Sequence, residues 1–196
     1  MMNSISGFIT FALAAVFVEN SLLSGYVGTD LVLSSMRRLP RLAAVSLLVS
    51  VFALLNSLTV FPFDALMDIK WMSYMPVRGF LLTVSTLLWY LLIGGLMRKI
   101  RWIKRTAGQL IPIAALNGAV LSAPLLLGAR GVDSFGAVFG TALGAGLGFF
   151  LASWLIGVGM RRFDNPDISQ HMRGAPAMLI YIGLLALAFS AFGGAF

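Results

Sequence analysis

The sequence has 196 residues, of which 59% are hydrophobic and only 11% are charged, and its mean hydropathy is +0.94. A soluble domain of this length carries far more charge, so the composition predicts a protein whose solvent is lipid. The net charge of +7 would favour nucleic acid as a partner of a soluble chain. In a membrane protein the positions of the basic residues matter instead, and we expect no nucleic-acid partner.

Six apolar runs are long enough to cross a bilayer, because about 30 Å of hydrocarbon takes roughly 20 residues of helix. In chain order they are Ile5–Val27, Leu42–Val60, Val77–Met97, Gly108–Leu127, Phe135–Met160 and Gly174–Phe196. None alternates polar and apolar residues as a barrel strand does, and only helices or closed barrels satisfy the backbone inside lipid. We therefore expect an all-α membrane protein, a single domain of six transmembrane helices.

The first run contains Glu19 and Asn20. No Lys or Arg precedes its apolar stretch, so we expect it to remain in the mature protein rather than act as a cleaved signal peptide. A carboxylate near the bilayer centre costs roughly 2.5–3.5 kcal/mol, so Glu19 is expected to face protein or water. It forms either an ion or proton site with Asn20 and Asn117, or a structural hydrogen bond between helices.

The first and fourth runs both contain residues that favour a break. Gly28 and Asp30 follow the first run, where Asp30 is either a helix cap or loop residue or part of the ion site. Asn117 and Gly118 interrupt the fourth, where Asn117 makes either a contact between helices, worth about 1 kcal/mol, or part of that site. Paired interrupted helices are typical of mid-membrane binding sites in transporters.

Similar residues recur in the two halves of the chain. Asn20 and Asn117 are 97 positions apart, and Arg78-Gly79 and Arg173-Gly174 are 95 positions apart. Since each half has three helices, related halves must have opposite orientations in the membrane. The pattern predicts an inverted 3+3 repeat, residues about 1–98 and about 99–196, with helices one and four broken.

Glycines recur every four residues along the fifth run, at Gly136, Gly140, Gly144 and Gly148. This spacing places them on one face of a helix and lets another helix approach closely. We expect a packing face, whose partner is a helix of this chain or of a second subunit.

The basic residues lie mainly in alternate loops. Eleven of the 14 Lys and Arg follow runs one, three and five, namely Arg37, Arg38, Arg41, Arg98, Lys99, Arg101, Lys104, Arg105, Arg161, Arg162 and Arg173, whereas Lys70, Arg78 and Arg130 lie on the other side. Because cytoplasmic loops are enriched in Lys and Arg, loops one, three and five are expected inside. Both termini are then outside the cytoplasmic membrane of a bacterium or archaeon.

The sequence contains few residues that could catalyse a reaction or bind a metal. The chain has no cysteine, and its one histidine, His171, lies in a basic loop. There is no second histidine to share a metal, and no nucleophile triad, Walker sequence or GxGxxG motif is present. We expect no catalytic residues, no metal ligands and no enzymatic activity of the chain by itself.

Three motifs carry a resemblance to a known family. The segments from Phe17 to Gly28, from Leu110 to Leu121 and from Arg173 to Gly194 resemble, in order, the first, fourth and last helices of the Rnf/Nqr integral membrane subunits, closest to the NqrE/RnfA branch. The resemblance covers nearly the whole chain. It implies an inverted-repeat fold whose broken helices meet at mid-membrane, in lipid beside an oppositely oriented homologue or a second copy, within a redox complex coupled to Na⁺ or H⁺ movement.

The chain departs from the family at two positions. The resemblance implies cysteines that hold an iron–sulfur cluster where this sequence has Asp30 and Gly118. Such clusters need thiolate or occasionally imidazole ligands, so we expect no cluster on this chain. The leading hypothesis is that it moves a cation (Na⁺ or H⁺) or a small solute through the broken-helix centre, near Glu19, Asn20, Asp30 and Asn117. The alternatives are a subunit of an electron-transport complex and a structural scaffold.

Overall fold

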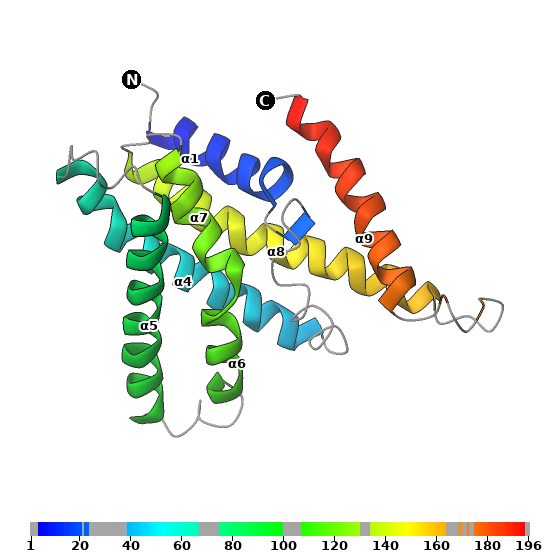
Figure 1. Ribbon diagram of the computed structural model, residues 1–196, viewed down its shortest axis with the longest axis horizontal. Helices are drawn as coiled ribbons and strands as arrows, with labels where there is room; N and C mark the ends of the chain where they lie inside the picture. The colour runs from blue at the N-terminus through cyan, green and yellow to red at the C-terminus, as the bar shows by residue number, and fades with distance from the viewer. Residues whose placement is uncertain are drawn as a thin grey trace.

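The computed structural model describes residues 4–20, 22–23, 39–66, 75–99, 107–129, 134–163, 169, 172 and 175–194. Within these ranges all regular secondary structure is helical (Figure 1). The elements are α1 (Ser4–Leu13), the π-helix η1 (Ala14–Val18), α4 (Leu39–Leu66), α5 (Met75–Lys99), α6 (Ala107–Ala115), α7 (Gly118–Ala129), α8 (Phe135–Phe163), α9 (Ala175–Ser190) and the 3-10 helix η2 (Ala191–Gly194). The all-α prediction is confirmed for this part of the chain.

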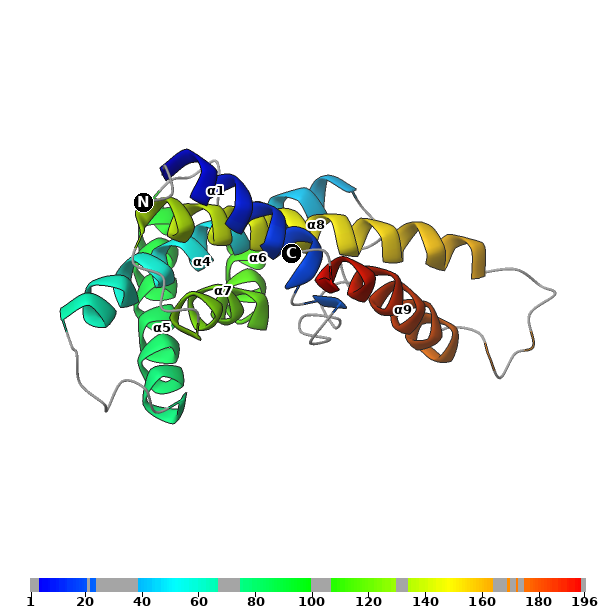
Figure 2. The ribbon, with the colours of Figure 1, turned by 90° about the horizontal axis from the view of Figure 1, so that it is seen from above.

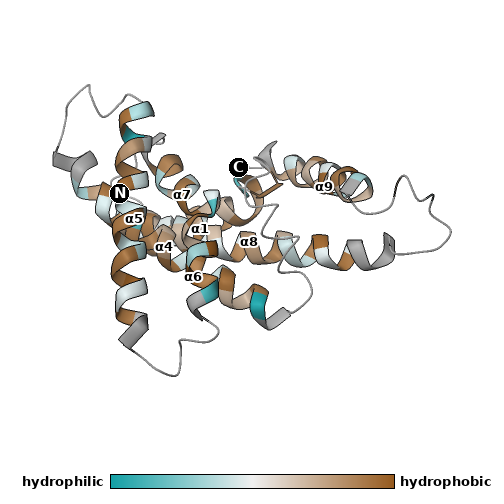
Figure 3. Ribbon diagram, turned by 60° about the horizontal axis from the view of Figure 1, so that its bottom comes forward, coloured by the Kyte–Doolittle hydropathy of each residue, from teal (hydrophilic) through white to brown (hydrophobic). Residues whose placement is uncertain are grey.

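Four segments are long and apolar enough to cross a membrane: Arg41–Pro62, Pro76–Leu96, Gln109–Leu127 and Phe135–Gly159. Two shorter apolar helices, Ile5–Val18 and Pro176–Ser190, coincide with the first and sixth predicted runs. Hydrophobic residues make up much of each helix in Figure 3, and many of them are exposed: Phe80 and Leu187, for example, are 69% and 70% exposed. Such surfaces would be unfavourable in water and are compatible with lipid.

The long helices α4 and α8 pack against each other at the centre of the molecule. Helices α1 and η1 lie on α8, whereas α6 and α7 lie on α4. Helix α5 packs beside α4, α6 and α7, and α9 lies beside α8 and η1 at the other end of the molecule in both Figure 1 and Figure 2. Helix α8 thus contacts the N-terminal helices α1 and η1, and α4 contacts both α6 and α7.

Helix α1 approaches α8 through glycines. A Cβ atom at Gly144 would lie 2.6 Å from the Ala12 carbonyl oxygen, and one at Gly140 would lie 2.5 Å from the Phe8 carbonyl oxygen. Cβ atoms do not tolerate such distances, so these positions need hydrogen in place of a side chain. Three of the four glycines of the spaced set, Gly140, Gly144 and Gly148, meet α1 or η1 of the same chain.

Another glycine of α8 packs against α4. A Cβ atom at Gly146 would collide with the Ser50 hydroxyl group and would lie 2.9 Å from the Ser46 carbonyl oxygen. Ser46 and Ser50 direct their hydroxyl groups to carbonyl oxygens one turn earlier in α4, so they leave no unpaired polar group at the crossing. Small residues on both helices allow the backbones of α4 and α8 to come close.

A polar seam joins α4 to α5. The Asn56 Nδ2 donates to the Thr86 Oγ1 at 2.7 Å, and the Ser85 Oγ donates to the Asn56 Oδ1 at 2.8 Å. One turn away the Trp89 Nε1 donates to the Thr59 Oγ1 at 2.9 Å. Asn56 is fully buried, so these bonds satisfy an amide that would otherwise be costly inside lipid.

Candidate functional site

The first helix is interrupted at Glu19. Helix α1 widens into the π-helix η1, and the Glu19 backbone N–H donates to the Ala14 carbonyl oxygen at 2.8 Å, five residues back. Glu19 itself has φ −108° and ψ 32°, outside the helical region, and the helix ends there. π-Helical turns are rare and occur often at functional sites.

Asn20 is the residue that organises this break. Its side chain is 3% exposed, and its Nδ2 donates to the Val16 carbonyl oxygen at 3.0 Å and to the Gly148 carbonyl oxygen of α8 at 2.9 Å. Its Oδ1 accepts the Leu22 N–H at 3.2 Å, and its carbonyl oxygen accepts the Leu23 N–H at 3.0 Å. Asn20 therefore caps the chain that follows the break and ties it to α8.

The second break has the same local construction. Helix α6 ends at Ala115, α7 begins at Gly118, and Asn117 lies between them with 4% exposure. The Asn117 Oδ1 accepts the Ala119 N–H at 3.1 Å, and its carbonyl oxygen accepts the Val120 N–H at 2.9 Å. Each asparagine thus caps the first N–H groups of the segment after its break, which would otherwise be unpaired inside the protein.

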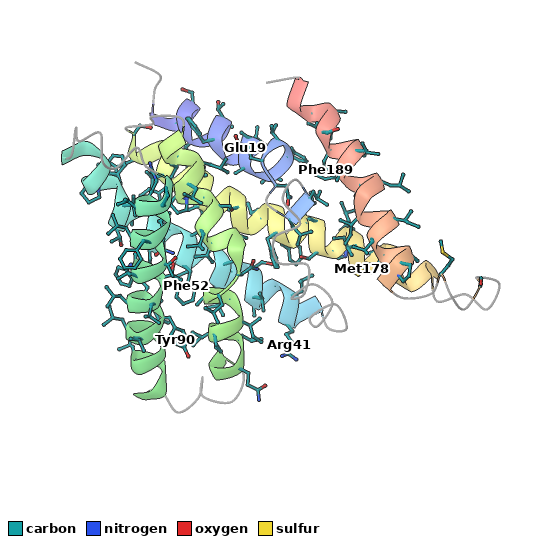
Figure 4. All side chains as sticks on the ribbon, in the orientation of Figure 1. Glu19, Arg41, Phe52, Tyr90, Met178 and Phe189 are labelled. Atoms are coloured by element: carbon teal, nitrogen blue, oxygen red, sulfur yellow. The ribbon has the colours of Figure 1, made fainter. Side chains whose placement is uncertain are left out.

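Both breaks lie in one apolar core. Leu22 and Leu23 after the first break, and Ala119 and Val120 after the second, belong to the same buried cluster. Residues of α4, α6, α8 and α9, including the fully buried Phe52 of α4 labelled in Figure 4, belong to the same cluster. The structure thus brings Asn20 and Asn117 to the packed centre formed by the two long helices.

The two asparagines differ in the hydrogen bonding of one side-chain atom, Nδ2. The Asn20 Nδ2 reaches the backbone of α8 because position 148 is glycine, where a Cβ atom would lie 3.0 Å from that nitrogen. Helix α4, on which the second broken helix packs, contains no glycine. The Asn117 Nδ2 is buried and has no hydrogen-bond partner among the described residues.

Glu19 is half-buried at the end of η1. An aromatic cluster joins η1 to the C-terminal helices: the Phe17 ring centroid is 6.2 Å from that of Phe189 and 5.5 Å from that of Phe192. Glu19 and Phe189 are labelled in Figure 4. The sequence pattern did not indicate this contact between the first break and the end of α9, because apolar residues at helical spacing are found in any membrane helix.

The predicted residues are only partly brought together. Asn20 and Asn117 share the core, Glu19 adjoins Asn20 in the chain, and Asp30 lies outside the described residues. Both asparagine Oδ1 atoms accept a backbone N–H, and the Asn117 Oδ1 keeps one further lone pair. The π-helix and the Gly148 carbonyl oxygen are parts of the site that sequence reasoning missed.

The residues present do not fit an iron–sulfur cluster. Gly118, at one of the two positions where the resemblance implies a cysteine, has no side chain to bind metal, and the chain contains no cysteine at all. Among the residues described by the structure, no group of three His, Cys, Asp or Glu side chains gathers in one place. Cluster ligands are thiolates or occasionally imidazoles, and neither is available at the breaks.

Where the structure describes the chain, all regular secondary structure is helical and several spans are apolar, one of them interrupted at a buried capping asparagine; these features define a multi-pass membrane protein. No protein-family model matches the sequence. Individual proteins, however, are similar to the chain in sequence. The chain is 26% identical over 184 residues to one subunit of the Na⁺-translocating ferredoxin:NAD⁺ oxidoreductase complex of Acetobacterium woodii, in an alignment that covers 93% of this chain and 94% of the relative.

It is also 26% identical over 194 residues to one subunit of the Na⁺-translocating NADH-quinone reductase of Chlamydia trachomatis, covering 93% of this chain and 79% of the relative. The chain also matches one subunit of the ion-translocating oxidoreductase complex of Pseudomonas paraeruginosa over a shorter stretch. The two are 34% identical over 90 residues, which is 46% of each chain. The chain is an Rnf/Nqr family membrane protein, related to the RnfA and NqrE proteins along most of its length.

Proposed function

We propose that this chain is a membrane subunit of an Rnf/Nqr-type complex that couples electron transport to the movement of Na⁺ or H⁺. The observation that carries the proposal is similarity to two such subunits over 93% of the chain. The first and fourth helices of this chain are both interrupted at a buried asparagine that caps the segment after the break, which also supports the proposal. Because this subunit supplies no thiolate, the electrons pass through cofactors that the other subunits of the complex hold.

The proposed fold is an inverted repeat of residues about 1–98 and about 99–196. The packing supports it: α8 of the second half holds α1 and η1 of the first, and α4 of the first half holds α6 and α7 of the second. The equivalent capping bonds of Asn20 and Asn117 also support it. In such repeats the interrupted helices meet at the bilayer midplane.

The proposed location is the cytoplasmic membrane of a bacterium or archaeon, with loops one, three and five inside and both termini outside. The distribution of Lys and Arg supports this orientation. The proposed partners are lipid, an oppositely oriented homologue or a second copy, and the redox subunits of the complex. A pair of oppositely oriented copies would place two broken-helix centres side by side.

A second candidate function is passage of a cation or proton through the broken-helix centre. The half-buried carboxyl group of Glu19 at the first break favours it. Glu19 and Asp30 would supply the charge, and the remaining lone pair on the Asn117 oxygen would supply a neutral ligand. A structural scaffold is the third alternative, and it predicts no effect of ions at these residues.

The complex can be tested by purifying the tagged chain from native membranes under mild detergent conditions. We expect subunits that carry flavin or iron–sulfur groups to co-purify, with the paramagnetic signal on reduction following those subunits. The control is the isolated chain expressed alone, which should contain no iron because it has no thiolate ligands. Recovery of this chain only with copies of itself, from membranes that contain the redox proteins, would contradict the proposal.

The ion path can be tested by thermal unfolding with increasing Na⁺ at constant ionic strength. For a bound ion at ten times its Kd, we expect the midpoint to rise by about 3 °C. Glu19→Gln and Asp30→Asn should abolish the rise, whereas the control Ser190→Ala, at an exposed position near the C-terminal end of α9, should keep it. Equal responses of the wild type and both carboxyl variants would leave the scaffold as the better account.

A further inference from the structure

The helices before the two breaks end in different hydrogen-bond registers. The Glu19 N–H donates to the Ala14 carbonyl oxygen, five residues back, which is the bond of a π-helical turn. The Leu116 N–H donates to the Pro112 carbonyl oxygen at 3.1 Å, four residues back, which is the ordinary α-helical bond. Glu19 and Leu116 each come directly before the asparagine of their break, so the two registers occur at equivalent positions.

The Asn20 side chain takes the acceptor that an α-helical register would use. In an α-helix the Asn20 backbone N–H would donate to the Val16 carbonyl oxygen, four residues back. In the structure the side-chain Nδ2 donates to that oxygen at 3.0 Å and also to the Gly148 carbonyl oxygen of α8 at 2.9 Å. Side-chain donors that compete with the backbone in this way favour a non-helical conformation. We call this pair of bonds the Asn20 latch.

The second break has no corresponding latch in the part of the chain that the structure describes. The Asn117 Nδ2 makes no hydrogen bond there, and the helix before it keeps the α-helical register. The Asn117 Oδ1 still accepts the Ala119 N–H, so the cap after a break does not require a latch. The same cap therefore occurs with a latched π-register at the first break and with an unlatched α-register at the second.

The register determines how exposed the residue before each asparagine is. Leu116 is 84% exposed, whereas Glu19 is half-buried. A change from the π-register to the α-register would turn Glu19 by about 100° around the helix axis, since an α-helix has 3.6 residues per turn. The Glu19 side chain would then take a position like that of Leu116. A carboxyl group facing lipid is unfavourable, so the latch keeps this group against the protein.

We propose that the first break is a switch between two registers. The Asn20 latch holds the π-register, in which Glu19 is half-buried, and release of the latch lets the helix take the α-register of the second break. Displacement of α8 would release the latch, because one of its two bonds goes to the Gly148 carbonyl oxygen. The switch would thus couple the packing of α8 to the position of the Glu19 carboxyl group. It concerns the conformation of the chain and rests neither on the redox partners nor on ion passage.

A spin label at position 19 tests the switch in the purified full-length chain in bilayers. The cysteine-free chain allows Glu19→Cys to be labelled alone, and Asn20→Ala then removes the latch. We expect the oxygen accessibility of the label to rise to that of a label at position 116, while its accessibility to a water-soluble nickel complex stays low. Unchanged oxygen accessibility would overturn the proposal, because the π-register would then persist without the amide. A rise in nickel accessibility would mean that η1 unfolds, and would also contradict the switch.

The matched control is Asn117→Ala with a label at position 116. The Asn117 Nδ2 bonds to no described residue, so its removal should leave the oxygen accessibility at position 116 unchanged. Equal changes at positions 19 and 116 would mean that loss of the cap moves the preceding residue, and would contradict the assignment to the latch. Neither result alters the expected co-purification with redox subunits, so the switch and the proposed function can fail separately.

A second variant weakens the latch from α8 if Asn20→Ala does not fold. A Cβ atom at Gly148 would lie 3.0 Å from the Asn20 Nδ2, so Gly148→Ala pushes the amide away and leaves its side chain intact. We expect the oxygen accessibility at position 19 to rise to a value between those of the latched chain and of position 116. No rise in this variant would overturn the proposal as well.

Discussion

Gly144→Leu is expected to abolish the packing of α1 on α8 and to give the largest loss of stability of any single substitution considered for this chain. A Cβ atom at this position would lie 2.6 Å from the Ala12 carbonyl oxygen and 2.8 Å from the Ala15 Cβ, so the α1 backbone would have to move. Overpacking of this kind typically costs about 1–3 kcal/mol, and displacement of η1 would add the loss of the bond between Asn20 and Gly148. Thermal unfolding in lipid nanodiscs measures the effect.

The matched control is Gly94→Leu in α5. Gly94 is also a helical glycine in a membrane-spanning segment, but a Cβ atom there would have nothing within 4 Å. We expect its midpoint to stay within about 2 °C of the wild type, or to rise, because replacing glycine in a helix favours the helical state. Equal losses in Gly94→Leu and Gly144→Leu would mean that the close contact between α1 and α8 does not exist.

Asn20→Ala is expected to destabilise the chain more than Asn117→Ala, although both remove a buried capping asparagine. Asn20→Ala removes the cap on Leu22 and two donated bonds, to Val16 and Gly148, for a loss of about 2–3 kcal/mol. Asn117→Ala removes only the cap on Ala119 and also eliminates an unpaired buried donor, for a loss of about 1 kcal/mol. Chemical unfolding of the two variants in the same detergent gives the difference directly.

The order of the two losses is the informative result. If Asn117→Ala were the more damaging variant, its Nδ2 would have an acceptor in the folded protein that the geometry does not contain. If neither variant lost stability, the N–H groups after the breaks would be paired without the asparagines. Either result would require a different structure for the two interruptions.

Much of this fold is predictable from hydropathy, because every helix that crosses a membrane must be apolar along most of its length. The run predicted as Phe135–Met160 corresponds to α8, Phe135–Phe163, and the run Val77–Met97 corresponds to α5, Met75–Lys99. The second break was also predictable, since Asn117-Gly118 combines a residue that caps helices with one that weakens them. The four-residue glycine spacing in α8 indicated a packing face, and the structure adds that α1 occupies it.

Other features depend on contacts that no local pattern encodes. The π-helix before Glu19 is built from Ala14–Val18, an apolar stretch that would form an α-helix equally well by propensity. The different use of the two asparagine amides follows from Gly148 in a helix more than a hundred residues away, and from the absence of glycine in α4. Asp30, a predicted site residue, lies outside the described residues and stays a prediction.

We expect the interrupted fourth helix to place Asn117 within the hydrocarbon, and the depth of a spin label at the neighbouring Leu116 tests this placement most directly. Leu116 is 84% exposed, and the cysteine-free chain allows a single cysteine to be introduced there without further substitution. In bilayers we expect a label at position 116 to be accessible to oxygen and shielded from a water-soluble nickel complex. A label at Met172, which is 45% exposed between α8 and α9, should show the reverse. Nickel accessibility at position 116 equal to that at position 172 would place the break at the membrane surface and contradict the account.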